Sequence, residues 1–246
     1  MDAVRGLCEY LKYGTPSMLM LVQELWSFEV LMLLAGFLGP TYQAVHVIML
    51  NIDTVLFQVS LGIAIAVSNK VGNSLGEGLP KVAKTYFYIS LILTLFLSII
   101  FITGCTLFRY QIPRIYTNHE EVIEIAGHIL PMLGLFTSID IFQGSMSGAI
   151  LAMGYQNFSI WANFIAYWLI GLPLTYYIMF PLKYGVYGMW TGMTLGTFLV
   201  GFSYLCKIYP TDWEKLSATI IYRIEKEKDK LAELTERDHF FSADNS

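Results

Sequence analysis

Residues 85–108 read TYFYISLILTLFLSIIFITGCTLF, a long run without one charged side chain. An α-helix rises about 1.5 Å per residue, so such a run is long enough to cross the roughly 30 Å hydrocarbon core of a bilayer. The pattern therefore predicts an all-α membrane protein with about six transmembrane helices. The other apolar stretches lie near 16–40, 42–67, 123–153, 157–180 and 184–206.

The overall composition agrees with a membrane protein. The 246 residues are 55% hydrophobic and 14% charged, whereas soluble domains carry about 25% charged residues. No basic patch with interleaved aromatic residues occurs, so we expect no nucleic-acid partner. The cysteines Cys8, Cys105 and Cys206 lie too far apart in sequence for a disulfide framework or a zinc site. We therefore expect neither a metal site nor a cofactor.

Three regions are expected along the chain. Residues 1–15 form a short amphipathic segment at the membrane interface, with Leu7 and Leu11 on one side. Residues 16–209 form a lobe of six transmembrane helices. Residues 210–246 form a charged cytoplasmic tail, whose helix is capped by Thr211 or Asp212.

The distribution of basic residues predicts the orientation in the membrane. Short cytoplasmic loops are enriched in Lys and Arg, and most such residues fall on the side that carries both termini. We expect both termini in the cytoplasm and a multi-pass protein of the plasma membrane or the vacuolar membrane. The basic residues on the cytoplasmic side are Arg5, Lys12, Lys70, Lys81, Lys84 and Lys207, against Arg109, Arg114 and Lys183 on the other side.

The charged residues inside the predicted spans are all acidic: Glu24, Glu29, Asp53 and Asp140. No Lys or Arg occurs between residues 13 and 69. A charged side chain at the centre of a span costs roughly 2.5–3.5 kcal/mol on insertion scales. Without basic partners these groups must be protonated, face water or bind a cation, so the four residues are candidates for a cation and proton pathway. Alternatively, a permanently protonated carboxyl could simply hydrogen-bond between helices.

Uncharged polar residues accompany the carboxylates at membrane depth. Glu24 and Glu29 are five residues apart, a rotation of about 140° on a helix, so they cannot share one narrow face. One of them can line a cavity while the other meets a neighbouring helix. His46 and His128 are expected to be structural. The supporting polar residues are Gln23, Asn51, Gln143 and Asn163, which we expect to face other helices or water.

Several motifs resemble the multidrug and toxic compound extrusion (MATE) family in its eukaryotic branch. PSMLMLVQELWSFE (16–29) is similar to the family pattern ending in E-x-W-x-F/Y-E, with Glu24 and Glu29 on its acidic positions. VSNKVGNSLGEGLPKVAK (67–84) resembles the V-G-N-x-L-G-A-G signature. The further matches are IYTNHEEVIEIAGHILP (115–131), NFIAYWLIGLPLTYYIMFPLKYGVYGMWTG (163–192) and TDW (211–213).

The sequence also departs from the family pattern. Leu151 stands where an arginine is usual, and Asn51 stands where animal members often carry a glutamate. Asp53 has no regular counterpart, whereas Asp140 falls on a position that is acidic in plant and animal members. These changes bear on substrate range more than on membership.

The resemblance implies a function as well as a fold. Family members have two lobes of six helices, so this chain would be the second, carboxy-terminal lobe, either lacking its amino-terminal lobe or pairing with a second half-transporter. The implied activity is antiport, in which organic cations or xenobiotics leave while H+ or Na+ enters, with Glu24 holding either ion in turn. No cofactor and no enzymatic reaction are implied. The alternative is an inactive or partner-dependent fragment that acts as a membrane interaction protein.

Overall fold

In a computed structural model, the backbone is described for residues 2–226 and 228, and the side chains from Gly14 onward within that range. The described residues are helical and contain no strand, which confirms the all-α prediction. The helices are α1 (Asp2–Gly36), α2 (Pro40–Gly76), α3 (Pro80–Leu107), α4 (Gln111–Arg114), α5 (Glu120–Ala152), α6 (Gln156–Asn163), the π-helix η1 (Phe164–Gly171), α7 (Leu172–Met179) and α8 (Gly185–Ile208). Residues 213–226 form a further helix, here called the tail helix.

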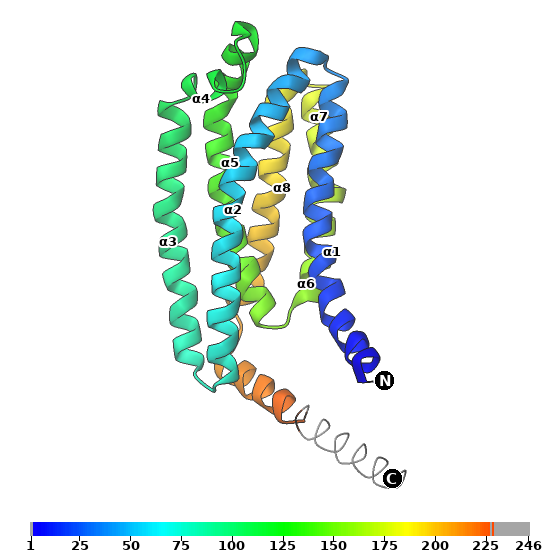
Figure 1. The fold of residues 1–246 in the computed structure, drawn as a ribbon, viewed down its shortest axis with the longest axis vertical. Coiled ribbons are helices and arrows are strands. Elements are labelled where there is room, and N and C mark those ends of the chain that lie inside the picture. The colour runs from blue at the N-terminus through cyan, green and yellow to red at the C-terminus, as the bar shows by residue number, and fades with distance from the viewer. Residues whose placement is uncertain (1, 227, 229–246) are drawn as a thin grey trace.

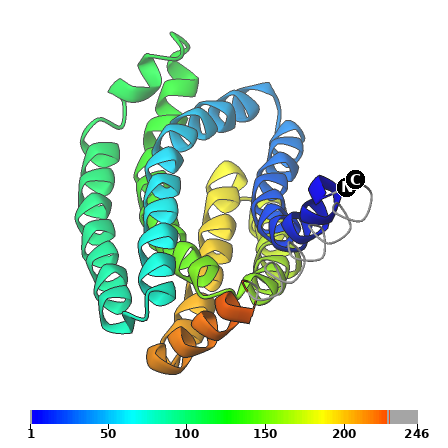
Figure 2. The ribbon, with the colours of Figure 1, turned by 60° about the horizontal axis from the view of Figure 1, so that its bottom comes forward.

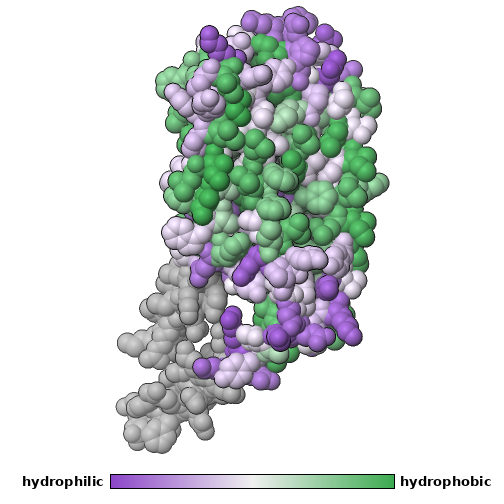
Figure 3. Space-filling model, turned by 180° about the vertical axis from the view of Figure 1, so that it is seen from behind, coloured by the Kyte–Doolittle hydropathy of each residue, from purple (hydrophilic) through white to green (hydrophobic). Residues whose placement is uncertain are grey.

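The long helices form a bundle of membrane-spanning segments (Figure 1). Among the described residues, five segments are long and apolar enough to cross a bilayer, and they begin at Gly14, Pro40, Pro80, Glu120 and Gln156. The last of these comprises α6, η1 and α7. Helix α8 spans 24 residues, but its glycines, threonines and tyrosines make it less apolar. Seen from behind, a hydrophobic belt lies between hydrophilic ends (Figure 3), so the chain is a multi-pass membrane protein with six long segments.

Glycine and proline lie at the turns that end the first two helices. Gly39 has a φ of 109° between α1 and α2, a conformation that favours glycine, and Pro40 then begins α2. Gly78, with a φ of 76°, likewise separates α2 from Pro80 at the start of α3. These two turns lie at opposite ends of α2, so α1, α2 and α3 cross the bundle in alternating directions (Figure 1).

Helix α5 lies at the centre of the bundle, where it packs against α2, α3 and α8. Small residues allow this close packing. A Cβ atom at Gly148 would collide with the backbone carbonyl oxygen of Ala64 in α2, and one at Gly134 would lie 3.0 Å from Cβ of Cys105 in α3. The glycines of α5 therefore set how near its neighbours can come.

Helix α1 is attached differently. It is continuous from Asp2 to Gly36 and leaves its turn with α2 in a diverging direction (Figure 2), and its other backbone contacts are mainly with α6, η1 and α7. An interfacial position for residues 1–15 stays a prediction. The side chains of Leu7, Leu11 and Cys8 lie outside the described residues.

One end of the bundle carries the amino-terminal end of α1, the α2–α3 turn, the α5–α6 turn and the tail helix (Figure 1). The tail helix begins at Trp213, after the Asp212 carboxylate accepts hydrogen bonds from the backbone N–H groups of Glu214 and Lys215. Asp212 is therefore the residue that caps it, one of the two candidates. The rest of the predicted tail, residues 227 and 229–246, lies outside the described residues.

Candidate cation and proton site

Three of the four predicted carboxylates come together from three helices. Glu24 of α1, Asp53 of α2 and Asp140 of α5 are 9%, 8% and 3% exposed. Glu24 and Asp53 both lie close enough to Asp140 for their charges to repel. We call these three residues the acidic cluster.

In the part of the chain that the structure describes, no basic side chain pairs with the acidic cluster. Within the described residues, the ion pairs are Arg114–Glu120, at the start of α5, and Lys215–Asp212, at the start of the tail helix. Three negative charges without a partner are unstable in a low-dielectric interior. The acidic cluster therefore needs bound protons or a cation to balance its charge.

Glu24 lies where three side chains hold α1 against the neighbouring span. The hydroxyl of Tyr167 donates to Glu24 Oε1 over 3.4 Å, the indole N–H of Trp168 donates to the Gln23 carbonyl over 3.2 Å, and Asn163 Nδ2 donates to the Met20 carbonyl over 3.3 Å. We call Asn163, Tyr167 and Trp168 the α1 clamp. These bonds fix the height and rotation of α1 at its carboxylate.

The π-helix explains how this clamp is assembled. Tyr167 and Trp168 lie within η1, and a π-helix closes its hydrogen bonds between residues five apart. Asn163 and Trp168, five residues apart, can therefore present their side chains to the same neighbour. In an α-helix the same spacing would turn them about 140° away from each other.

The clamp is itself anchored to α8. The hydroxyl of Tyr204 donates to Asn163 Oδ1 over 2.7 Å, and both residues are almost completely buried. Asn163 uses its amide nitrogen for α1 and its amide oxygen for α8. One side chain thus links α1, the α6–η1 span and α8.

The other two carboxylates lie along the contact between α2 and α5. Thr137 Oγ1 lies 3.4 Å from Asp53 Oδ1, to which it donates, and also 2.9 Å from its own-helix carbonyl of Leu133. Ser60, two turns beyond Asp53 on the same face of α2, donates to the backbone carbonyl of Asp140 over 3.3 Å. Hydroxyl groups rather than charges therefore surround this part of the acidic cluster.

A cavity of about 250 Å³ opens beside Glu24, between α1, α2 and α5. Its walls are mostly apolar, and Glu24 is the one carboxylate among its lining residues. Asn69 and Asn163 add amide groups. This combination of apolar walls and a single carboxylate suits a ligand with a hydrophobic body and one positive charge.

Among the described residues, none of the remaining candidates hydrogen-bonds to a carboxylate of the acidic cluster. Glu29 is exposed on α1, and Asn51 is exposed with its amide bonded to the Val47 carbonyl of its own helix. Gln143 is buried against Gly201 of α8. The Oε1 atom of Gln23 is buried without a hydrogen-bond partner among the described residues.

Sequence reasoning missed the hydroxyl groups that contact the acidic cluster. They come from Ser60, Thr137 and Tyr167, and the seven-residue spacing between Asp53 and Ser60 is the signal that could have found the first of them. His46 is packed in the core as a structural residue, but within the described residues it lacks the hydrogen bonds expected of one. It is buried against Trp190, with ring centroids 5.8 Å apart, and neither of its ring nitrogens has a hydrogen-bond partner within the described part of the chain.

Known proteins share this sequence and arrangement. A family model described as MatE matches residues 16–177. Multidrug and toxin extrusion protein 1 of Danio rerio is 30% identical over 90% of this chain, and Protein DETOXIFICATION 31 of Arabidopsis thaliana is 32% identical over 92% of it. These matches cover 38% and 44% of the two relatives, so the chain spans less than half of their length.

A solved structure has the same fold. The crystal structure of the eukaryotic MATE transporter AtDTX14 superimposes with a TM-score of 0.81 at 28% identity. The match covers 91% of this chain and 50% of that protein, as expected for one lobe of a two-lobe fold. On the family match over most of its membrane-spanning part, supported by the relatives and the shared fold, the chain belongs to the MatE family of multidrug and toxic compound extrusion transporters.

Proposed function

We propose that this chain is the carboxy-terminal lobe of an antiporter that exports organic cations while protons or sodium ions move inward. In this mechanism Glu24 binds the exported cation and the coupling ion in turn. The observation that carries the proposal is the position of Glu24, a buried carboxylate without a basic partner at the wall of a cavity.

The cavity favours a lipophilic cation over other substrates. Met20, Leu61 and Ile65 provide apolar walls, against which an aromatic or aliphatic body can pack. Only Glu24 offers a full charge there, so an anion would be repelled. The names of the relatives, multidrug and toxin extrusion protein and DETOXIFICATION, agree with substrates of this kind.

The need to balance the charge of the acidic cluster couples export of the organic cation to entry of protons or sodium ions. The acidic cluster holds three carboxylates whose charges repel, so a cation that binds at Glu24 takes over the role of a proton or sodium ion in balancing them. Ions that return from outside then displace the substrate. The exchange needs no covalent chemistry and no cofactor, so the protein acts as a transporter and not as an enzyme.

A second lobe is expected opposite α1. Alternating access moves one bundle against another around a shared site, and this chain supplies one bundle. Glu29, which is exposed at membrane depth, would be costly against lipid and suits a water-filled path between two lobes. Without its amino-terminal lobe or a second half-transporter, the chain is expected to be an inactive, partner-dependent membrane protein.

In this proposal both termini face the cytoplasm, and the membrane is either the plasma membrane or the vacuolar membrane. The end that carries the α2–α3 turn and the tail helix (Figure 1) holds Lys70, Lys81 and Lys207, as the positive-inside rule requires. A cysteine introduced at Glu77, which is exposed, should resist an impermeant reagent applied outside intact cells. Labelling from outside would show that the orientation is the opposite of the proposed one.

Binding by the purified chain tests the site directly. Calorimetric titration with tetraphenylphosphonium, repeated in buffers of different ionisation enthalpy, measures both affinity and the number of protons released. We expect the wild-type chain to release protons on binding and to bind more weakly as the pH falls. Glu24→Gln keeps the size of the side chain but should lose proton release, whereas Glu29→Gln, on the opposite face of the same helix, should behave like the wild type. Proton release that persists in Glu24→Gln would contradict the assignment.

A transport assay tests whether the amino-terminal lobe is needed for activity. Reconstituted alone in proteoliposomes, the chain should give no efflux of the same cation when a pH gradient is applied, because no second bundle is present to move. Efflux should appear when an amino-terminal lobe is supplied, and Glu24→Gln should abolish it. Robust efflux by the chain alone would instead make it a self-sufficient transporter.

A further inference from the structure

The tail helix is docked against the cytoplasmic end of the bundle instead of extending away from it. Ser217 Oγ donates to the carbonyl oxygen of Leu75 in the last turn of α2 over 2.7 Å, and Trp213 packs on Phe87 of α3 with ring centroids 6.0 Å apart. Ile221 lies over Gly78 in the α2–α3 turn. These contacts attach one face of the tail helix to the bundle and so fix the position of its opposite face.

That opposite face forms one wall of a cavity of about 410 Å³, here called the tail cavity. The second wall is the α5–α6 turn, where Gly154 has a φ of 76°. The lining combines apolar and polar groups. Its polar and aromatic lining residues are Tyr155, Thr211, Asp212, Lys215, Thr219 and Arg223.

The tail cavity has an excess of positive charge. Lys215 and Arg223 line it, and Lys207 lies at its edge with Nζ 4.7 Å from the ring centre of Tyr155. Arg223 makes no ion pair within the part of the chain that the structure describes. Within that part of the chain, no carboxylate competes with a ligand for its guanidinium group.

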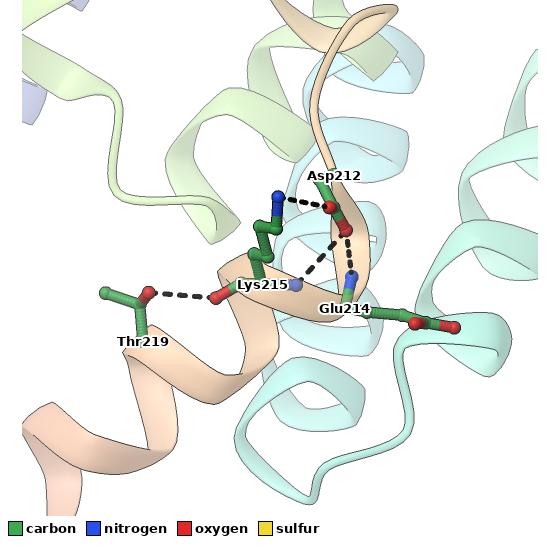
Figure 4. A network of polar contacts seen from close by, with 4 residues as sticks. All are labelled: Asp212, Glu214, Lys215 and Thr219. Carbon is green, nitrogen blue, oxygen red and sulfur yellow. Dashed lines mark hydrogen bonds and ion pairs between the residues drawn. The ribbon is translucent and has the colours of Figure 1, made fainter.

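The acidic residue of the tail cavity is already engaged. Asp212 Oδ1 accepts the backbone N–H groups of Glu214 and Lys215 over 3.1 and 3.2 Å, and Oδ2 lies 3.5 Å from Lys215 Nζ. Figure 4 shows these contacts, with the side chain of Glu214 directed away from that of Lys215. Among the described residues that line or border the tail cavity, one aspartate thus lies near three basic side chains.

The hydroxyl groups narrow the choice of ligand. Thr219 Oγ1 donates to the Lys215 carbonyl over 2.8 Å and Thr211 Oγ1 to the Lys207 carbonyl over 2.9 Å. Their protons are used, so towards a ligand these oxygens act as acceptors. Acceptors suit the hydroxyl groups of a polyol and do not suit further phosphate oxygens.

We propose that the tail cavity binds the headgroup of an anionic phospholipid that carries a phosphate and free hydroxyl groups, as in phosphatidylinositol or phosphatidylglycerol. Arg223 contacts the phosphate through its planar fork, Lys215 and Lys207 add positive charge, and the two threonines accept from the polyol. Lys207 lies in the last turn of α8, at the depth of headgroups. Anionic lipids are enriched in the cytoplasmic leaflet, on which the proposed orientation places this end.

The test is a binding titration of the purified chain in mild detergent with short-chain phosphatidylinositol, followed by native mass spectrometry. Arg223→Gln should weaken binding about ten-fold, since loss of one charge alone accounts for about five-fold and the fork for the remainder. Arg223→Lys should fall between Arg223→Gln and the wild type. Lys226→Gln removes an exposed cation of the same helix outside the tail cavity and should change the affinity less than two-fold.

Each outcome decides the proposal. Equal losses in Arg223→Gln and Lys226→Gln would mean diffuse electrostatic attraction and would overturn the site. Phosphatidylserine, which is anionic but lacks a polyol, should bind more weakly than phosphatidylinositol, and equal binding would overturn the role of Thr211 and Thr219. Glycerol 3-phosphate serves as the soluble arm. If it binds as tightly as the lipid and requires Arg223, the site is a phosphate site supplied from solution, and the lipid source is overturned.

Discussion

Helices α5 and α1 each carry a carboxylate of the acidic cluster, but they are attached to the bundle in different ways. In the most apolar part of α5, 61% of residues are buried, against 22% in α1. Glycines such as Gly144 and Gly148 bring α5 into backbone contact with α2. α1 is less buried and is held by the hydrogen bonds of the α1 clamp together with the packing of Phe28 on Phe136 and Trp190.

This difference assigns separate roles to the two helices. The close packing of α5 against its neighbours is lost only when the helices separate. Asp140 therefore keeps its position as long as the bundle is folded. Hydrogen bonds between membrane helices contribute only about 0.6 kcal/mol each on average, and Tyr167 bonds directly to the carboxylate that is proposed to change its ion. Glu24 thus lies on the part of the lobe that can be released at low cost.

The largest effect is expected at the close packing of α5 against α2. Gly148→Ala places a Cβ atom against the Ala64 carbonyl, so α2 and α5 must separate, at a cost of about 1–3 kcal/mol in unfolding free energy. Gly62→Ala is the matched control on α2, because its Cβ would meet nothing within 4 Å and alanine favours the helix by roughly 0.4–1 kcal/mol. Reversible unfolding in mixed micelles measures both. Equal destabilisation would show that close approach is not what holds α5.

A smaller effect is expected at the α1 clamp. Tyr204→Phe removes the hydroxyl that donates to Asn163 Oδ1 and should cost about 0.6 kcal/mol, with about 1.7 kcal/mol as the upper end for such bonds. Hydrogen exchange of α1 should accelerate while that of α5 stays unchanged. Tyr209→Phe, at a side chain that is 86% exposed, is the control. If exchange in α5 rises as much as in α1, the two helices are not held independently.

The smallest effect is expected at the N-terminal cap of the tail helix, which is exposed to water. The backbone N–H of Lys215, followed by its side chain and the N–H of Glu214, lowers the pKa of Asp212 below its ordinary value of 3.8. The cap is therefore complete above about pH 3.8 and is lost as the pH falls through the lower value of the folded state. Asp212→Ala should accelerate exchange of the first tail-helix amides at neutral pH and remove this pH dependence. Glu214→Gln should leave both unchanged, and an equal response in the two variants would exclude a capping role.

Much of the fold could be predicted from the sequence. The charge-free run at 85–108 and its five counterparts identify the spans because the bilayer excludes charge, and Gly39–Pro40 and Gly78 mark turns because their backbone conformations suit few other residues. The acidic positions Glu24, Asp53 and Asp140 could be found for the same reason. Their meeting in space depends on how three helices pack together, which no local pattern of residues encodes.

Two parts of the site were beyond sequence reasoning. Whether Glu24 or Glu29 points inward could not be decided, because the lipid-facing and packed sides of a membrane helix are both apolar and leave little periodic signal. The α1 clamp was hidden for another reason. Tyr167 lies 143 positions from Glu24, and its direction follows from a π-helix, whereas sequence patterns are read with the period of an α-helix.

The π-helix also fixes the length of its span. η1 winds more loosely than an α-helix, so it contains residues that a regular helix of the same height would not need. Deleting one residue from 172–174, in the regular helix that follows η1, would turn everything beyond the deletion by about 100° relative to α6. Thr175 would then leave Gly192, where the two backbones are so close that no Cβ fits. Membrane spans usually tolerate small changes in length by tilting; this one is expected to accept neither insertion nor deletion, because its two halves are in register with different neighbours.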